Sequence, residues 1–175
     1  MEATLATARA LAETDIAAVL HVGIAGATSL ETGTVVIGSQ SIYCDVLDPN
    51  ATLPRVARLT PAAWLLTAMR RALPDAIVSP IATAARVGGG DGHPVEAMEG
   101  FGVLRAAAGA GVPAIEIRVI SNDPADTDRS LWRIDDAVAV LHQTIKTAVP
   151  VVIESSAAAT HITAGSRSTS HEVPS

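Results

Sequence analysis

The chain has 175 residues, 49% of them hydrophobic and only 2% aromatic, and its net charge at pH 7 is -6. This length suits one domain whose core is built almost wholly from Ala, Val, Leu and Ile, so stacking on a ligand could draw only on Trp64, Trp132, Tyr43 or Phe101. The acidic balance argues against binding of nucleic acid or of an anionic membrane surface, and the single cysteine, Cys44, excludes an intrachain disulfide framework and suits a reducing cytoplasm.

The predicted elements alternate between helices and strands. In chain order they are a helix at 3–14, strands at 17–24, 35–37 and 41–46, a helix at 62–73, strands at 76–87 and 95–96, a helix at 100–110, a strand at 115–121 and a helix at 134–147. This alternation predicts an α/β fold with a largely parallel sheet covered on both faces. We expect one domain over residues 1–150 and a disordered tail over 154–175, where Ser, Thr, Ala and Gly show no apolar period.

No segment is predicted to be a signal peptide or a membrane span. The N-terminal helix is amphipathic, and the apolar run from Ile16 to Ala27 is too short to span a membrane and contains His21. His161 and His171 lie in the predicted tail at no metal-ligand spacing. We therefore expect neither a metal nor another cofactor.

Two glycine-rich segments are weak candidates for a binding site. The loop from Gly88 to Gly92 lacks the Lys and Ser/Thr of a P-loop, so a plain mobile loop is the better interpretation. Gly23-Ile-Ala-Gly26 follows a predicted buried strand, where small residues usually permit close packing. Its functional interpretation is a close approach of backbone N–H groups to a ligand or water at the strand end.

Glu99 lies where a predicted strand passes into a helix. The structural interpretation is an acid favoured by the helix dipole, and on position alone this interpretation leads. The functional interpretation is a carboxylate that accepts two hydroxyl hydrogen bonds, as a ribose diol would offer. Ligands of open α/β sheets bind outside the carboxyl ends of the strands, where Glu99 and Asn122 would both lie.

Polar residues also occupy the predicted strand before Asn122. Glu116 and Arg118 alternate with apolar residues and so project from one face of the strand, where a buried structural pair is the favoured interpretation. Asn122 begins the sequence Asn-Asp-Pro124, which is typical of a turn. The functional alternative is an amide that reads the edge of a base.

Four segments together carry a resemblance to a known family. They are Val22-Gly-Ile-Ala-Gly-Ala27, Glu96-Ala-Met-Glu-Gly100, Ile117-Arg-Val-Ile-Ser-Asn122 and Asp128-Arg-Ser-Leu-Trp-Arg133. In this order and approximate spacing the chain resembles the nucleoside phosphorylase and nucleosidase superfamily, and within it the futalosine hydrolases. The resemblance implies a three-layer αβα sandwich, and hydrolysis of futalosine to hypoxanthine and dehypoxanthine futalosine in menaquinone biosynthesis.

The resemblance also implies roles for residues in these segments. Glu99 would hold the ribose hydroxyls, and Met98 would pack against the sugar. Ala25 and Gly26 would line the base and water side through their backbone. The implied partners are a small purine nucleoside and a second copy of the chain in a homodimer, in the cytoplasm and without a cofactor.

Asn122 and its neighbour Ser121 would recognise the base. Adenine-specific relatives carry, at the position of Asn122, an aspartic acid that donates to N7. A 6-oxopurine presents two acceptors, N7 and O6, to which an Asn amide can donate where an ionised Asp would be repelled. Asn122 and Glu99 are therefore the expected catalytic residues, with Asp123 in reserve if the strand register differs by one.

The chain also departs from this family. The opening strands and the usual water-activating glutamate have no counterpart, so we expect an N-terminally shortened sheet that lacks on the order of 50 residues. Gly88–Gly90 replaces a Thr-Gly-Thr loop, which alters recognition of the substrate. Two alternatives follow: a purine nucleoside phosphorylase, although no arginine-bearing phosphate motif is present, or a catalytically silent nucleoside-binding remnant.

Overall fold

The computed structural model describes residues 2–46, 50 and 56–167, without the side chains of 160–167. Its helices are α1 (Glu2–Glu13), α2 (Ala63–Ala72), α3 (Gly100–Gly109) and α4 (Ile134–Arg167), and a 3-10 turn, η1, spans Arg129–Leu131. Its strands are β1 (Val19–Ala27), β2 (Val35–Tyr43), β3 (Arg58–Leu59), β4 (Ile77–Thr83), β5 (Val95–Ala97) and β6 (Ala114–Asn122). The two-residue strand β3 lies between the predicted strand at 41–46 and the predicted helix at 62–73, where no element was predicted.

The two strands predicted at 35–37 and 41–46 join into one continuous strand, β2, which ends at Tyr43. In the gap between the two predicted strands the register against β4 shifts, between Gly38 and Gln40. A Cβ atom at Gly38 would lie 3.2 Å from the Ile81 side chain and 3.3 Å from the Glu116 carbonyl oxygen. Glycine therefore lets β2 bend here while its neighbours stay close.

The six strands pair in the order β3-β2-β4-β5-β1-β6, and β2 pairs with β6 as well, so the sheet curls back on itself. The β1–β6, β2–β4 and β4–β5 pairs are parallel, and the β1–β5, β2–β3 and β2–β6 pairs are antiparallel. The predicted α/β class is confirmed, and the sheet is largely parallel as predicted, because the long β1–β6 and β2–β4 pairings are parallel whereas the antiparallel pairings are short. The link between β1 and β2 is too short to hold a crossover helix, so β2 runs back against the direction of β1.

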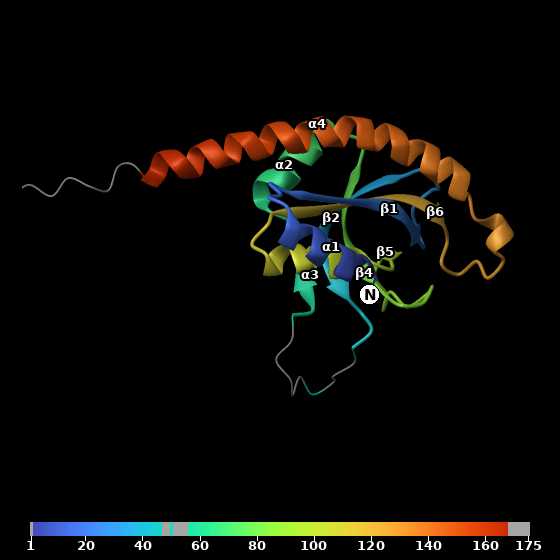
Figure 1. Cartoon of the computed structure of the whole chain (residues 1–175). Coiled ribbons are helices and arrows are strands. Elements are labelled where there is room, and N and C mark those ends of the chain that lie inside the picture. Colours follow the sequence, from blue (N-terminus) through green and yellow to red (C-terminus); the bar gives the residue numbers. More distant parts are fainter. Residues whose placement is uncertain (1, 47–49, 51–55, 168–175) are drawn as a thin grey trace, which may run out of the picture.

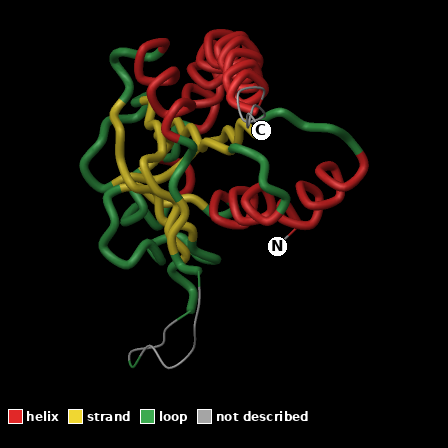
Figure 2. The backbone as a smooth tube through the Cα atoms, turned by 90° about the vertical axis from the view of Figure 1, so that its left-hand side faces the viewer, coloured by secondary structure: helices red, strands yellow, loops and turns green. Residues whose placement is uncertain are grey.

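Helices cover the sheet on both sides, as predicted for a layered αβα fold (Figure 1). On one side, Leu65 and Met69 of α2 and Ala148 of α4 pack on Ile115 and Ile117 of β6. On the other side, Val103, Leu104 and Ala107 of α3 form a second core, against which α1 packs. The tube view shows α1 and α3 well separated from the long helix α4 (Figure 2).

Helix α4 continues through most of the predicted tail. The expectation of a disordered segment from Glu154 is wrong as far as Arg167, and residues 168–175 lie outside the described part of the chain. Ser156 is buried and its hydroxyl donates to the Val152 carbonyl oxygen at 2.7 Å. Alanines follow at 157–159, and their high helix propensity explains why the helix persists without an apolar period.

One stretch of α4 is longer and more apolar than expected from the sequence. Within Ile134–Ala159, an 18-residue window has a mean hydropathy of 1.2, so this helix could cross a membrane by length and composition alone. The expectation that no span reaches this length is therefore wrong. The helix packs against α2, β1 and β6, and core helices of globular proteins pass the same test, so this stretch is weak evidence for a membrane.

Candidate functional site

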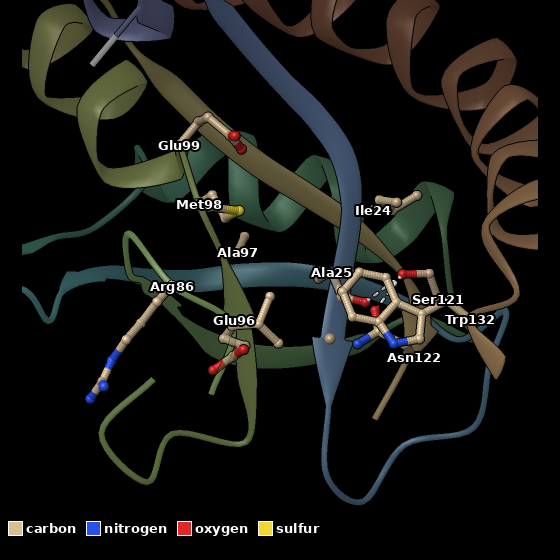
Figure 3. Close-up of a pocket in the computed structure, with 12 residues that line it drawn as sticks. Ile24, Ala25, Arg86, Glu96, Ala97, Met98, Glu99, Ser121, Asn122 and Trp132 are labelled. Atoms are coloured by element: carbon tan, nitrogen blue, oxygen red, sulfur yellow. Dashed lines mark hydrogen bonds between the residues drawn. The ribbon is translucent and has the colours of Figure 1, made fainter. Parts of the chain in front are cut away.

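A pocket of about 190 Å³ lies between the end of β1, the junction of β5 with α3 and the end of β6. All six predicted site residues line it: Ala25, Gly26, Met98, Glu99, Ser121 and Asn122. The close-up shows Met98 and Glu99 on one side and Ser121 and Asn122 on the other (Figure 3). The structure thus brings together the carboxylate and the amide that the sequence singled out.

The reason for this proximity differs from the prediction. Glu99 and Asn122 were expected to follow two strands that point the same way, but β5 is antiparallel to β1 whereas β6 is parallel to it. From Glu96, which pairs with Gly26, the chain therefore runs back along β1 towards Glu99. The pocket follows the last residues of β1 and is not confined to one edge of the sheet.

A bulge shapes the end of β6 at the site. Ala25 pairs with Ile120 but Gly26 pairs with Asn122, so Ser121 is the extra residue. The Ser121 hydroxyl is buried, 2.8 Å from Asn122 Oδ1 and 3.2 Å from the Ala25 carbonyl oxygen. Because Oδ1 can accept from this hydroxyl, the Asn122 amide keeps its two N–H donors for the pocket.

Gly26 leaves room for that amide. A Cβ atom at Gly26 would lie 3.3 Å from Asn122 Nδ2 and 2.9 Å from Cγ of Pro124. Both contacts are tighter than side chains normally make. The small residue predicted for close backbone approach is therefore required by its neighbours, and it keeps the amide accessible.

Glu99 is at the N-cap of α3 but does not cap it. Its side chain makes no capping hydrogen bond, is exposed, and has no partner within the described part of the chain. Met98 beside it is 50% exposed and lines the same pocket. An unpaired carboxylate beside an exposed apolar side chain suits a ligand that has both hydroxyl and apolar surfaces.

Side chains other than Glu99 stabilise the N-terminus of α3. The Phe101 N–H donates to Thr83 Oγ1 at 2.9 Å. The Glu116 carboxylate fills the space over Gly100, where a Cβ atom would lie 2.1 Å from its Oε1. A carboxylate at this end of a helix is favoured by the helix dipole.

Glu116 belongs to a buried polar network, as the sequence predicted for Glu116 and Arg118. Arg118 Nε donates to Glu116 Oε1 at 2.7 Å, and both side chains are almost fully buried. On its other side, Arg118 Nη2 lies 2.5 Å from Nε2 of His21. Burial, helped by the Arg118 charge, lowers the pKa of His21 to about 3, so this imidazole is neutral at pH 7 and accepts from the guanidinium.

Sequence reasoning missed Glu96 as a pocket residue. Its carboxylate accepts from the backbone N–H groups of Gly88 at 2.6 Å and of Gly90 at 2.9 Å. The glycine loop therefore closes around a side chain of its own chain and is not a phosphate cradle. This loop was predicted to be a plain mobile loop, and Glu96 accepts hydrogen bonds from two of its amides. The run of three glycines was the sequence feature that could have indicated a close approach of this loop's backbone to another group.

Five further pocket residues were not among the six predicted site residues: Ile24, Arg86, Val87, Ala97 and Trp132. Trp132 was noted for its motif and as a possible stacking group, and the short apolar residues gave no signal. Among the described residues no cluster of His, Cys, Asp or Glu could hold a metal ion. The side chain of His161 and the whole of His171 lie outside that part.

Comparisons with known proteins agree with the resemblance inferred from the sequence. No protein-family model matches the chain. Over 63 residues, 34% of its length, it is 48% identical to a futalosine hydrolase from Streptomyces coelicolor, and the match spans 27% of that relative. The chain is thus aligned with about a quarter of the curated relative.

Solved structures extend the likeness of the fold to most of the chain. A 5'-methylthioadenosine/S-adenosylhomocysteine nucleosidase from Colwellia psychrerythraea, in complex with adenine, has a TM-score of 0.76 and 21% identity, covering 86% of this chain and 73% of that one. Futalosine hydrolase of Helicobacter pylori also has a TM-score of 0.76, at 17% identity, covering 85% and 74%. The predicted resemblance is confirmed, and the fold is that of these nucleosidases.

Proposed function

We propose that this protein is a nucleosidase that uses water to cleave the N-ribosidic bond of a 6-oxopurine nucleoside, with futalosine as its substrate. The observation that carries the proposal is the pocket in which Glu99 and Met98 face Ser121 and Asn122 (Figure 3). The likeness to a futalosine hydrolase supports the choice of substrate. The products would be hypoxanthine and dehypoxanthine futalosine, in menaquinone biosynthesis in the cytoplasm, and we expect a homodimer that needs no cofactor.

Glu99 would hold the sugar. Its carboxylate is unpaired and exposed to the pocket, so its two oxygens are free to accept from the two ribose hydroxyls. Cleavage of an N-ribosidic bond develops positive charge on the ribose, as in glycosidases. A fixed negative charge beside the sugar stabilises that charge, and Met98 supplies an apolar surface for the rest of the ring.

Asn122 would hold the departing base. With Oδ1 engaged by the Ser121 hydroxyl, Nδ2 is directed to donate. The N7 and O6 atoms of a 6-oxopurine are both acceptors, and hydrogen bonds to them strengthen as the base gains negative charge. The amide therefore stabilises the leaving group without itself giving up a proton.

The water must be activated by a further group. Two carboxylates, Glu96 and Glu99, line the pocket in the described part of the chain. Glu96 is occupied by the amides of Gly88 and Gly90, and Glu99 is assigned to the ribose. Binding of the nucleoside and stabilisation of its base are thus the steps for which these residues account.

The test is incubation of the protein with futalosine and measurement of hypoxanthine by chromatography. We expect release by the wild type and a fall of roughly 100-fold or more for Glu99→Gln, because the charge that stabilises the sugar cation is lost. Glu154→Gln, at an exposed position of α4 away from the pocket, is the matched control and should keep full activity.

Other outcomes separate the alternatives. Product that forms only with inorganic phosphate and includes ribose 1-phosphate would show a phosphorylase. Binding of the intact nucleoside without release of hypoxanthine would show a silent binder. Equal activity of Glu99→Gln and the wild type would exclude the assigned role of Glu99.

A further inference from the structure

The pocket has one aromatic side chain in reach of a bound base. The chain contains four aromatic residues, all within the part that the structure describes. Tyr43 and Phe101 stack on each other, with ring centroids 5.2 Å apart and planes inclined by 18°, and neither lines this pocket. Trp64 lies on α2 and lines a separate groove against α4. Trp132 alone among the four lines the candidate site (Figure 3).

The backbone fixes Trp132 beside the residue that would read the base. The Arg133 N–H donates to the Ser121 carbonyl oxygen at 2.8 Å, so the residue after Trp132 is tied to the residue before Asn122. The preceding turn is held by Asp128, whose side chain accepts from the Ser130 N–H at 2.9 Å. The segment therefore returns to the end of β6 with its indole at the pocket.

The indole itself is held in one orientation. Its Nε1–H donates to the Asp126 carbonyl oxygen at 3.2 Å, and the Arg129 guanidinium lies over the ring, 5.3 Å from the ring centroid. The side chain is only half-buried, so part of the ring is left for contact with a ligand. An ordered, partly open indole with its polar atom satisfied is suited to stacking.

We propose that Trp132 is the stacking platform for the purine and, with Asn122, determines that this pocket takes a flat 6-oxopurine. Asn122 hydrogen-bonds to the edge of the base, and Trp132 stacks on its face. The proposal rests on the proposed function, because it assigns the base to this pocket. Stacking of a base on an aromatic side chain contributes enough to make binding roughly 5- to 150-fold weaker when it is lost.

Tryptophan fluorescence tests the contact directly, because Trp64 and Trp132 are the chain's two tryptophans. In Trp64→Phe, Trp132 is the sole reporter, and in Trp132→Phe the sole reporter is Trp64. With hypoxanthine as the probe and excitation at the red edge of the indole absorption, we expect quenching in Trp64→Phe and none in Trp132→Phe. Equilibrium dialysis measures the affinity of each form independently of fluorescence.

Dialysis should give Trp132→Leu a hypoxanthine affinity roughly 5- to 150-fold below that of the wild type, with Trp132→Phe within a few-fold of it. Unchanged affinity of folded Trp132→Leu, or equal quenching in the two single-tryptophan forms, would overturn the assignment of Trp132. Should Trp132→Leu fail to fold, as judged by circular dichroism, the comparison of the two phenylalanine variants decides. Failure of every form, including the wild type, to bind hypoxanthine would refute the proposed function and this assignment together.

Discussion

Replacing Gly100 by alanine tests how the start of α3 is built. A Cβ atom at this position would lie 2.1 Å from Oε1 and 2.3 Å from Oε2 of Glu116, closer than a methyl group and a carboxylate can approach. The Glu116 side chain is 1% exposed and pairs with Arg118, so it has no solvent to move into. The alanine must therefore displace a buried ion pair or the first turn of the helix.

The cost follows from these two possibilities. Overpacking a core position costs about 1–3 kcal/mol, and separating a buried pair costs about 3–5 kcal/mol. We expect Gly100→Ala to lower the free energy of unfolding by about 3 kcal/mol. For a chain of this size the melting temperature should fall by roughly 6–12 °C.

Urea and thermal unfolding followed by circular dichroism measure this loss. Gly109→Ala, at the other end of α3, is the matched control, because its Cβ atom would meet only an Arg105 nitrogen at 3.9 Å. That variant should be neutral or more stable by up to about 1 kcal/mol. In a double-mutant cycle, Gly100→Ala should cost much less when Glu116 is already alanine. A loss below about 1 kcal/mol in the wild-type background would refute the packing of Glu116 against Gly100.

Two further predictions concern His21 and Asn122. Burial lowers the pKa of His21 to about 3, so between pH 6 and pH 4 the unfolded chain binds a proton at this residue that the folded chain does not. The free energy of unfolding should therefore decrease as the pH is lowered through this window. In His21→Gln its slope against pH should be smaller by about 1.4 kcal/mol per pH unit. Identical slopes for the two proteins in urea titrations would contradict the neutral imidazole. Asn122→Asp replaces a donor by a carboxylate opposite two acceptors, so hypoxanthine should bind roughly 5- to 150-fold more weakly while adenine gains relative to it. Equilibrium dialysis with both bases checks this, and an unchanged preference would show that Asn122 does not read the base.

The sequence predicted the helices and strands well because their apolar patterns are regular. The pattern of β6, with Glu116 and Arg118 between Ile115, Ile117 and Val119, also predicted a buried polar pair, and the structure has it. Pairing between distant strands leaves no such pattern. The three-residue strand β5 runs parallel to β4 but antiparallel to β1, and this depends on partners far away in the chain; the sequence pattern predicted one common direction for β1, β5 and β6.

The candidate site was predictable where a side chain has chemistry of its own. Glu99 and Asn122 carry polar groups in unusual places, and both line the pocket. Glu96 was missed because an acid beside a strand has no special signal until the Gly88 and Gly90 amides fold onto it. Trp132 was one of four aromatic residues that could stack on a ligand, and the sequence could not single it out because its place at the pocket depends on the long-range hydrogen bond from Arg133 to Ser121.

Glu99 is available for a ligand because other side chains stabilise the N-terminus of α3. An acid at this position would ordinarily accept a capping hydrogen bond or interact favourably with the helix dipole, and the dipole was the leading structural interpretation. Here Thr83 accepts the Phe101 N–H, and the carboxylate of Glu116 supplies the negative charge against Gly100. Gly100→Ala should therefore disturb the sugar-binding carboxylate as well as stability, so that a folded fraction of this variant would release hypoxanthine more slowly than Gly109→Ala.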